Sequence, residues 1–206
     1  MLNIARRSFI AAGLATGLAA GLTTLASPSL AVEMGDDGLH KTQWQRDTFK
    51  DLREDLAEAN AEGKRLLIMI EQRGCIYCKK MHEEVYPDPE ITKMIEDNFF
   101  VIQINMFGDV EVTDFDGESL PEKDVVQKWG MLFTPTSMYF PEQVAEGVSA
   151  KDAAVSTVPG AFGKLTTYNM MQWVLDHGYE GDEPFQKYHA RMVAKQQEQG
   201  KLNVSE

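Results

Sequence analysis

Two short, uninterrupted apolar runs divide the chain, and helical patterns surround them. Residues 65–71 read RLLIMIE and residues 99–105 read FFVIQIN. Runs of this length without polar alternation are typical of strands buried on both faces of a sheet. The connection between them is long enough to be helical, so we expect the two strands to pair in parallel.

Elsewhere, apolar residues recur at the three- and four-residue steps of amphipathic helices. Residues 42–63 place Phe49, Leu52, Leu56 and Ala59 on one face, which predicts a helix that ends at a glycine. Asp88 is a candidate N-cap for a helix that opens with a proline. Further helices are predicted over residues 75–85, 122–129 and 165–177 and from about residue 183.

The remaining pattern predicts two more strands and a polar hairpin. Residues 134–140 read TPTSMYF, and residues 153–158 read AAVSTV, close enough to pair antiparallel. Residues 106–120 are acidic and indicate a solvated hairpin that turns at Asp116 and Gly117, while residues 142–152 indicate a loop or small insertion. Helices alternating with strands in this order predict an α/β layer fold around a mixed sheet.

The amino end has the pattern of an export signal. Arg6 and Arg7 precede an uncharged stretch rich in Ala, Gly and Leu, and Ser29, Leu30 and Ala31 supply a small-residue exit. The paired arginines fit the twin-arginine type of signal. We expect cleavage after Ala31 and a periplasmic protein, with a retained membrane anchor as the alternative.

Charge and length restrict the partners and the organisation of the chain. It carries 20 Lys and Arg against 32 Asp and Glu, a formal charge of −12, which argues against nucleic acid as a partner. We divide the chain into a signal peptide at residues 1–31 and a helical segment at residues 32–63. Residues 64–180 form the main domain, and residues 181–206 form a C-terminal helical extension.

Cys75 and Cys78 are the only cysteines, and they stand in the sequence GCIYCKK. Attachment of haem needs His directly after the second cysteine, where Lys79 stands. Structural zinc generally needs four ligands, and a staple across so small a loop removes little entropy from the unfolded chain. An inert disulfide and a reversible redox pair remain. The second is favoured because the start of a helix stabilises a thiolate at Cys75.

A buried strand, a Cys-Ile-Tyr-Cys sequence that opens a helix, and Thr134 with Pro135 opening a later strand together resemble the thioredoxin superfamily. The resemblance implies a thioredoxin fold with an added N-terminal helix and C-terminal helical extension. It also implies a disulfide between Cys75 and Cys78, with Cys75 as the nucleophile and Cys78 as the resolving thiol. Pro135 would be a cis-proline facing the pair, and Tyr77 would join Thr134 and Pro135 in contacting the substrate.

More narrowly, the sequence EQRGCIYCKKMHEEVYPDPEI looks like periplasmic thioredoxins of the SoxW type, which are associated with sulfur oxidation. This implies a monomer that reduces periplasmic protein disulfides with electrons from a membrane reductase. The Tyr-Cys sequence and His82 are also similar to disulfide isomerase domains, so an oxidase or isomerase is the alternative. A metal carrier using Cys75, Cys78 and His82 is a third interpretation. For the leading function we expect no cofactor and no metal site.

Several positions depart from the thioredoxin pattern. Gly74 replaces the tryptophan that usually precedes the first cysteine, and Ile76 and Tyr77 replace Gly-Pro. Met69 stands where thioredoxins keep a buried aspartate that serves the resolving thiol. Glu71 lies two residues further along the same strand face, so we expect it to replace that acid in part as a proton acceptor. The alternative is a solvated glutamate at the end of a strand.

Overall fold

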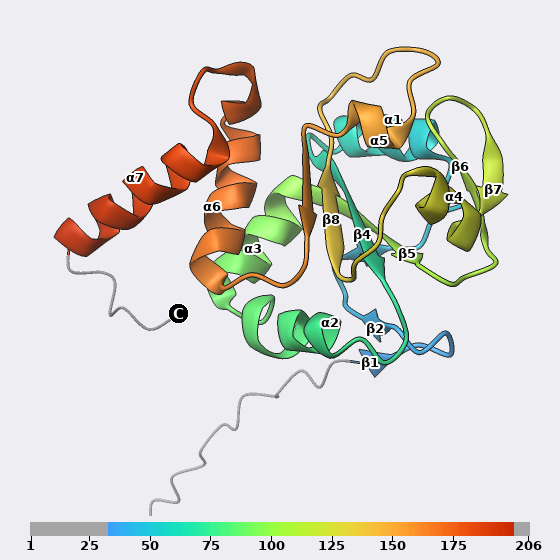
Figure 1. The fold of residues 1–206 in the computed structure, drawn as a ribbon, viewed down its shortest axis with the longest axis horizontal. Coiled ribbons are helices and arrows are strands. Elements are labelled where there is room, and N and C mark those ends of the chain that lie inside the picture. Colours follow the sequence, from blue (N-terminus) through green and yellow to red (C-terminus); the bar gives the residue numbers. More distant parts are fainter. Residues whose placement is uncertain (1–32, 200–206) are drawn as a thin grey trace, which may run out of the picture. The chain divides into compact units, whose positions relative to one another are not determined.

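The computed structural model describes residues 33–199 and places a five-stranded mixed sheet at the centre (Figure 1). In spatial order the strands are β3 (Gln45–Arg46), β5 (Phe99–Asn105), β4 (Arg65–Glu71), β8 (Thr136–Tyr139) and β9 (Ser156–Pro159). β3 and β4 run parallel to β5, whereas β8 is antiparallel to β4 and β9 is antiparallel to β8. The predicted mixed sheet is thus confirmed, with both apolar runs at its centre.

Helices and two small hairpins surround this sheet. The helices are α1 (Leu52–Ala61), α2 (Ile76–Lys80), α3 (Pro89–Asn98), α4 (Glu122–Lys128), α5 (Ala150–Ala153), α6 (Lys164–Leu175) and α7 (Phe185–Glu198). A π-helical turn η1 (Met81–Val85) continues α2, and a 3-10 turn η2 (Gly178–Glu180) follows α6. β1 (Glu33–Met34) pairs with β2 (His40–Lys41), and β6 (Glu111–Thr113) pairs with β7 (Ser119–Pro121). α7 is the C-terminal helix that the sequence predicted.

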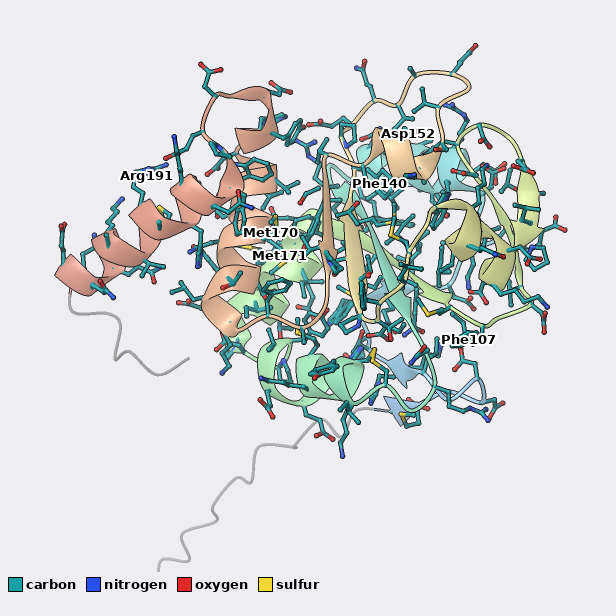
Figure 2. All side chains as sticks on the ribbon, viewed as in Figure 1. Phe107, Phe140, Asp152, Met170, Met171 and Arg191 are labelled. Carbon is teal, nitrogen blue, oxygen red and sulfur yellow. A yellow bond between two sulfur atoms is a disulfide. The ribbon has the colours of Figure 1, made fainter. Side chains whose placement is uncertain are left out.

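The sheet separates two apolar clusters, because successive side chains of a strand point to opposite faces. From β4, Ile68 packs against residues of α1 and α4, while Leu67 and Met69 pack against α3 and α6. Phe140 belongs to the first cluster and Met171 to the second (Figure 2). A strand in this position must be apolar on both faces, which is the reason for the continuous run at residues 65–71.

Local signals set several helix boundaries. The Asp88 carboxylate accepts a hydrogen bond from the amide of Glu90 at 3.1 Å, and Pro89 occupies the first position of α3. Gly63 takes φ +68° after α1, a conformation that favours glycine. The predicted N-cap of α3 and the glycine at the end of α1 are both confirmed.

The helix predicted over residues 42–63 is wrong in its first half. α1 begins only at Leu52, since Lys50 has φ +57° and the Asp51 side chain caps the amides of the first turn. The residues before it pair in parallel with β5, forming β3, and Phe49 is 95% exposed. Pairing with the free edge of the sheet therefore outweighs the helical periodicity. As a result the segment at residues 32–63 contains three short strands as well as a helix.

Three sequence predictions reach beyond the described residues. The twin-arginine signal and its cleavage after Ala31 lie outside them, as does the end of the C-terminal extension beyond residue 199. Between residues 33 and 199, no helix combines the length and apolar character that crossing a bilayer requires. The insertion at residues 142–152 includes the start of α5, which the sequence did not predict.

Candidate active site

Cys75 and Cys78 lie at the start of α2 and are joined by a disulfide, with their Cα atoms 5.2 Å apart. Gly74, with φ +72°, turns the chain from the end of β4 into this helix. Cys75 is the N-cap residue, and its sulfur accepts a hydrogen bond from the amide of Cys78 at 2.9 Å. Cys75 is 7% exposed and Cys78 is fully buried, so an incoming group reaches Cys75 first.

The loop before β8 faces the disulfide. The Thr134 hydroxyl donates to Cys75 Sγ at 3.3 Å, and the carbonyl oxygen of Thr134 lies 3.5 Å from the same sulfur. The peptide bond between Thr134 and Pro135 is cis, and the Pro135 carbonyl accepts a hydrogen bond from the amide of Gly160 at 2.7 Å. Residues 59 positions apart in the chain therefore form one site.

Exposed apolar side chains surround this contact. Ile76 and Tyr77, next to Cys75, are 72% and 58% exposed, and Leu132 and Phe133, just before Thr134, are 78% and 64% exposed. Side chains of this size are normally covered in a soluble domain, and a group of them marks a contact surface. Tyr77 thus lies at the rim of the site, where the sequence predicts substrate contact.

Part of the chain is similar to a known protein family. Residues 52–148 match the family model described as "Thioredoxin-like domain". The residues carrying that match include both cysteines and the Thr134–Pro135 segment. Residues 52–148 are therefore similar to a thioredoxin-like domain. A comparison with curated proteins found no significant match.

Two solved structures are similar to this chain, and the first of them supports the thioredoxin-like fold. A thioredoxin-fold protein from Helicobacter pylori is 14% identical, with a TM-score of 0.50 over 64% of this chain and 81% of that chain. A thioredoxin from Thermus thermophilus is 20% identical, with a TM-score of 0.46 over 61% of this chain and 84% of that chain. The protein therefore has a thioredoxin-like fold with a CxxC pair at Cys75 and Cys78.

Glu71, at the end of β4, is buried rather than solvated. It is 1% exposed, and its carboxylate contacts His82 Nε2 at 2.8 Å and accepts a hydrogen bond from Gln103 at 2.6 Å. The alternative of a strand-end glutamate in solvent is therefore wrong. Within the described chain, the side-chain hydrogen bonds of Glu71 go to His82 and Gln103, and none goes to a cysteine.

His82 lies in η1, where α2 widens into a π-helical turn. Its ring is 1% exposed and stacks on His40 of β2, with ring centroids 4.7 Å apart. Trp44 lies parallel to it at 6.3 Å, and Tyr86 meets it edge-on at 5.1 Å. The structure thus groups His82 with Glu71 and His40 instead of with the two cysteines. His40 was not predicted as a site residue, because no local sequence pattern connects it to Glu71 and His82, which lie at least 31 positions further along the chain.

The acidic hairpin at residues 106–120 is not wholly solvated, contrary to the expectation from sequence. Asp114 is 1% exposed and accepts hydrogen bonds from the Trp129 indole at 2.8 Å and the Ala150 amide at 2.7 Å. Lys128 lies 2.9 Å from the Asp114 carboxylate. Although partial burial opposes it, contact with Asp114 and two further carboxylates raises the pKa of Lys128. Asp114 therefore joins the hairpin to α4 and α5.

Proposed function

We propose that this protein is an exported thiol–disulfide oxidoreductase that reduces disulfides in other proteins through Cys75 and Cys78. The observation that carries the proposal is the environment of Cys75 Sγ. It receives hydrogen bonds from the Cys78 amide and the Thr134 hydroxyl at the start of a helix. The same donors and the helix dipole would stabilise a Cys75 thiolate once the disulfide is reduced.

The reaction follows from which sulfur is accessible. The Cys75 thiolate attacks one sulfur of a substrate disulfide, forming a mixed disulfide and releasing the other sulfur as a thiolate. Cys78 then loses its proton and attacks Cys75 Sγ, which restores the Cys75–Cys78 disulfide and releases the second substrate thiol. The substrate gains two electrons and the protein loses two. A donor dithiol must return them, and we assign this role to a membrane reductase.

Glu71 is our candidate for the group that accepts the proton of Cys78. Its burial beside His82 supports this role, because a buried carboxylate that exchanges a proton needs a polar neighbour to share it. His82 follows Cys78 by one helical turn and carries the second titratable group of the pair. We propose that the Glu71–His82 pair accepts the proton together.

The substrate surface is proposed to be the apolar rim around Cys75. Ile76, Tyr77, Leu132 and Phe133 would contact apolar side chains next to the substrate disulfide. An extended substrate segment would lie against Thr134 and Pro135, as the resemblance to the thioredoxin superfamily implies. Such a surface favours unfolded or flexible polypeptides over small disulfides.

The cellular setting is also part of the proposal. The twin-arginine pattern at Arg6 and Arg7 supports export to the periplasm, with cleavage after Ala31. The resemblance to SoxW-type thioredoxins supports partners in sulfur oxidation. It also supports a monomeric protein. The formal charge of −12 supports protein partners rather than nucleic acid.

The test is reduction of insulin with dithiothreitol as the electron source. The wild-type protein should accelerate precipitation of the insulin chains, and the Cys75→Ser variant should not while keeping its fold. Equal rates with and without the protein would overturn the proposal. The reduction potential then gives the direction: a value near that of thioredoxin, about −270 mV, supports a reductant, and one near −120 mV supports an oxidase.

A further inference from the structure

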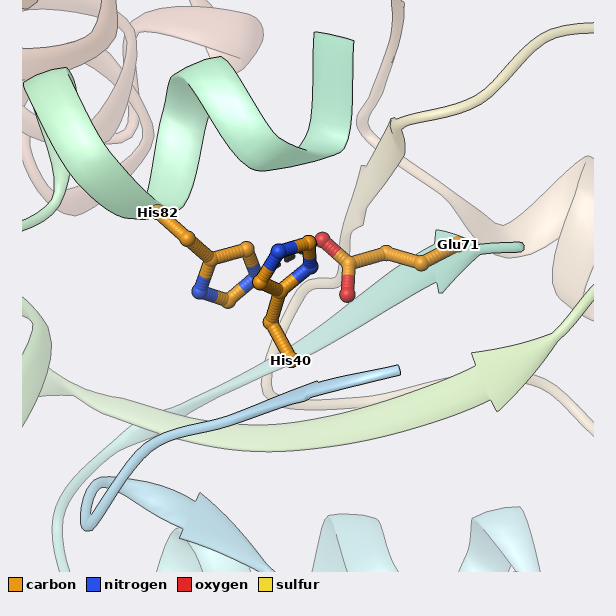
Figure 3. A group of neighbouring side chains, drawn as sticks. All are labelled: His40, Glu71 and His82. Atoms are coloured by element: carbon orange, nitrogen blue, oxygen red, sulfur yellow. Dashed lines mark hydrogen bonds and ion pairs between the residues drawn. The ribbon is translucent and has the colours of Figure 1, made fainter. Parts of the chain in front are cut away.

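Three side chains of kinds that bind metals come together from three separate segments. They are His40 of β2, Glu71 at the end of β4 and His82 of η1 (Figure 3). One nitrogen or oxygen from each lies within 4.8 Å of the others. Within residues 33–199 no other group of three His, Cys, Asp or Glu side chains comes this close. We propose that these three residues form a binding site for a divalent transition-metal ion such as Zn²⁺.

The contact between Glu71 and His82 already has the right chemistry and spacing. His82 Nε2 and Glu71 Oε1 are 2.8 Å apart and both side chains are 1% exposed. A zinc ion binds nitrogen and carboxylate oxygen at about 2.0–2.2 Å, so it can replace the hydrogen bond between these atoms with a small separation of the two side chains.

His40 supplies the movable third ligand. Its ring lies parallel to that of His82, at an interplanar angle of 14°, so the lone pairs of the two rings do not yet converge. His40 is only half-buried, in a two-residue strand of the N-terminal segment. A turn of its side chain directs a nitrogen toward the Glu71–His82 pair, whereas the buried Glu71 need not move far.

The two ring nitrogens of His82 differ in their hydrogen bonding. Its Nδ1 atom is buried and has no hydrogen-bond partner among the described residues. An imidazole held on one side by Glu71 and on its faces by stacked rings can adjust within its plane to meet an ion. A purely structural histidine with this burial is normally hydrogen-bonded at both nitrogens.

A supporting residue ties two of the ligands together. Gln103 Nε2 donates to Glu71 Oε2 at 2.6 Å and to the carbonyl oxygen of His40 at 2.9 Å. Its own Oε1 accepts from Lys41 Nζ at 2.7 Å. Residues that orient metal ligands in this way are a regular part of metal sites. The Trp44 and Tyr86 rings cover His82 and limit the access of water.

The kinds of donor atom restrict which ions the site can hold. The three residues supply two imidazole nitrogens and a carboxylate oxygen. Two imidazoles and one carboxylate suit Zn²⁺ and similar transition ions, while Ca²⁺ and Mg²⁺ prefer sites made of oxygen atoms alone.

The test is titration of the oxidised full chain with Zn²⁺ after removal of bound metal with a chelator. In the oxidised protein the two cysteines are joined, so they offer no thiolate to the ion. We expect one equivalent of Zn²⁺ to bind, and we expect His40→Ala to weaken binding at least about tenfold. His189→Ala is the matched control, because His189 is equally half-buried but bonded to Asn169, and it should bind as the wild type does.

Failure of wild-type protein to bind one equivalent, or equal affinity of His40→Ala and wild type, would overturn the site. A second measurement needs no variant. On addition of Zn²⁺ to the oxidised wild-type protein, the imidazole NMR signals of His40 and His82 should shift, and those of His177 and His189 should stay in place. The opposite pattern, or no shift in any of the four, would also overturn it.

Discussion

The Nε2 atom of His82 lies 2.8 Å from Oε1 of Glu71, and both side chains are almost completely buried. Cys78 lies four residues before His82 on the same run of helix, and Glu71 ends the strand that leads into the cysteines. A buried acid–base pair one helical turn from Cys78 can store or remove a proton where water has little access. The proposed role of Glu71 depends on this pair.

The Glu71→Gln variant tests that role. Glutamine retains the shape and a hydrogen bond to His82 but cannot accept the Cys78 proton. We expect the exchange rate at neutral pH to fall about tenfold, below the roughly 10²-fold effect of a general base with no substitute, and the pH dependence of the rate to change. Glu84→Gln, at an exposed position of η1, is the control. A pH–rate profile identical to that of the wild type would refute the role.

Much of this site could be predicted from the chain because its parts carry local signals. The run at residues 65–71, the turn at Gly74 and the cysteine pair stand next to one another, and Thr134 with Pro135 opens a recognisable strand. These features depend on burial and on backbone conformation, and both of these can be recognised from the types and spacing of residues along the sequence. The same holds for Asp88 and its cap on α3.

The parts that escaped prediction depend on contacts distant in the chain. β3 is only Gln45–Arg46 and forms because β5 has a free edge, a property of the folded sheet. His40 meets His82 only because β2 is placed beside η1 by the turns before it. Asp114 looks like any residue of an acidic hairpin, and its burial depends on Trp129 and Ala150.

Asp114 should therefore contribute more to stability than its neighbours. Replacement by Ala leaves the Trp129 indole and the Ala150 amide without acceptors and leaves Lys128 without its buried partner. We expect a loss of about 3 kcal/mol in the free energy of unfolding, measured with urea. Asp116→Ala, which removes an exposed partner of the same lysine, should cost less than about 1 kcal/mol. Equal effects of the two substitutions would contradict the assignment.

Asp55, in the first turn of α1, should make stability depend on pH. Burial, together with the nearby Glu58 and Asp51, raises its pKa from 3.8 to about 6, although a hydrogen bond with Thr48 opposes this. The folded protein thus holds this proton more tightly than the unfolded chain. The associated stability is fully present below about pH 4 and is lost as the pH rises through 6.

The Asp55→Asn variant isolates this effect. It removes the charge that burial disfavours, so the free energy of unfolding at pH 7.5 should rise, by at most about 3 kcal/mol. At pH 4 the variant and the wild type should differ little. Asp47→Asn, at an exposed position, should change neither value by more than about 0.5 kcal/mol. A variant destabilised equally at both pH values would show that Asp55 has another role.

The apolar rim predicts a difference between large and small substrates. Tyr77→Ser and Phe133→Ser remove contact area for a polypeptide but leave the environment of Cys75 Sγ intact. We expect kcat/KM for insulin to fall about tenfold for the pair of substitutions, equal to about 1.4 kcal/mol. The rate with a small aromatic disulfide should be unchanged. Phe49→Ser, an exposed apolar residue before α1, is the control, and an equal loss on both substrates would argue against recognition at the rim.

The most direct test of the central claim is trapping of the mixed disulfide. The Cys78→Ser variant retains the nucleophile at the accessible position but has no thiol to release the substrate, so it should accumulate a covalent adduct with a protein disulfide. Dithiothreitol should release the adduct, which mass spectrometry would locate at Cys75. The Cys75→Ser variant should form no such adduct. Equal trapping by both variants, or none by either in a folded protein, would contradict the account.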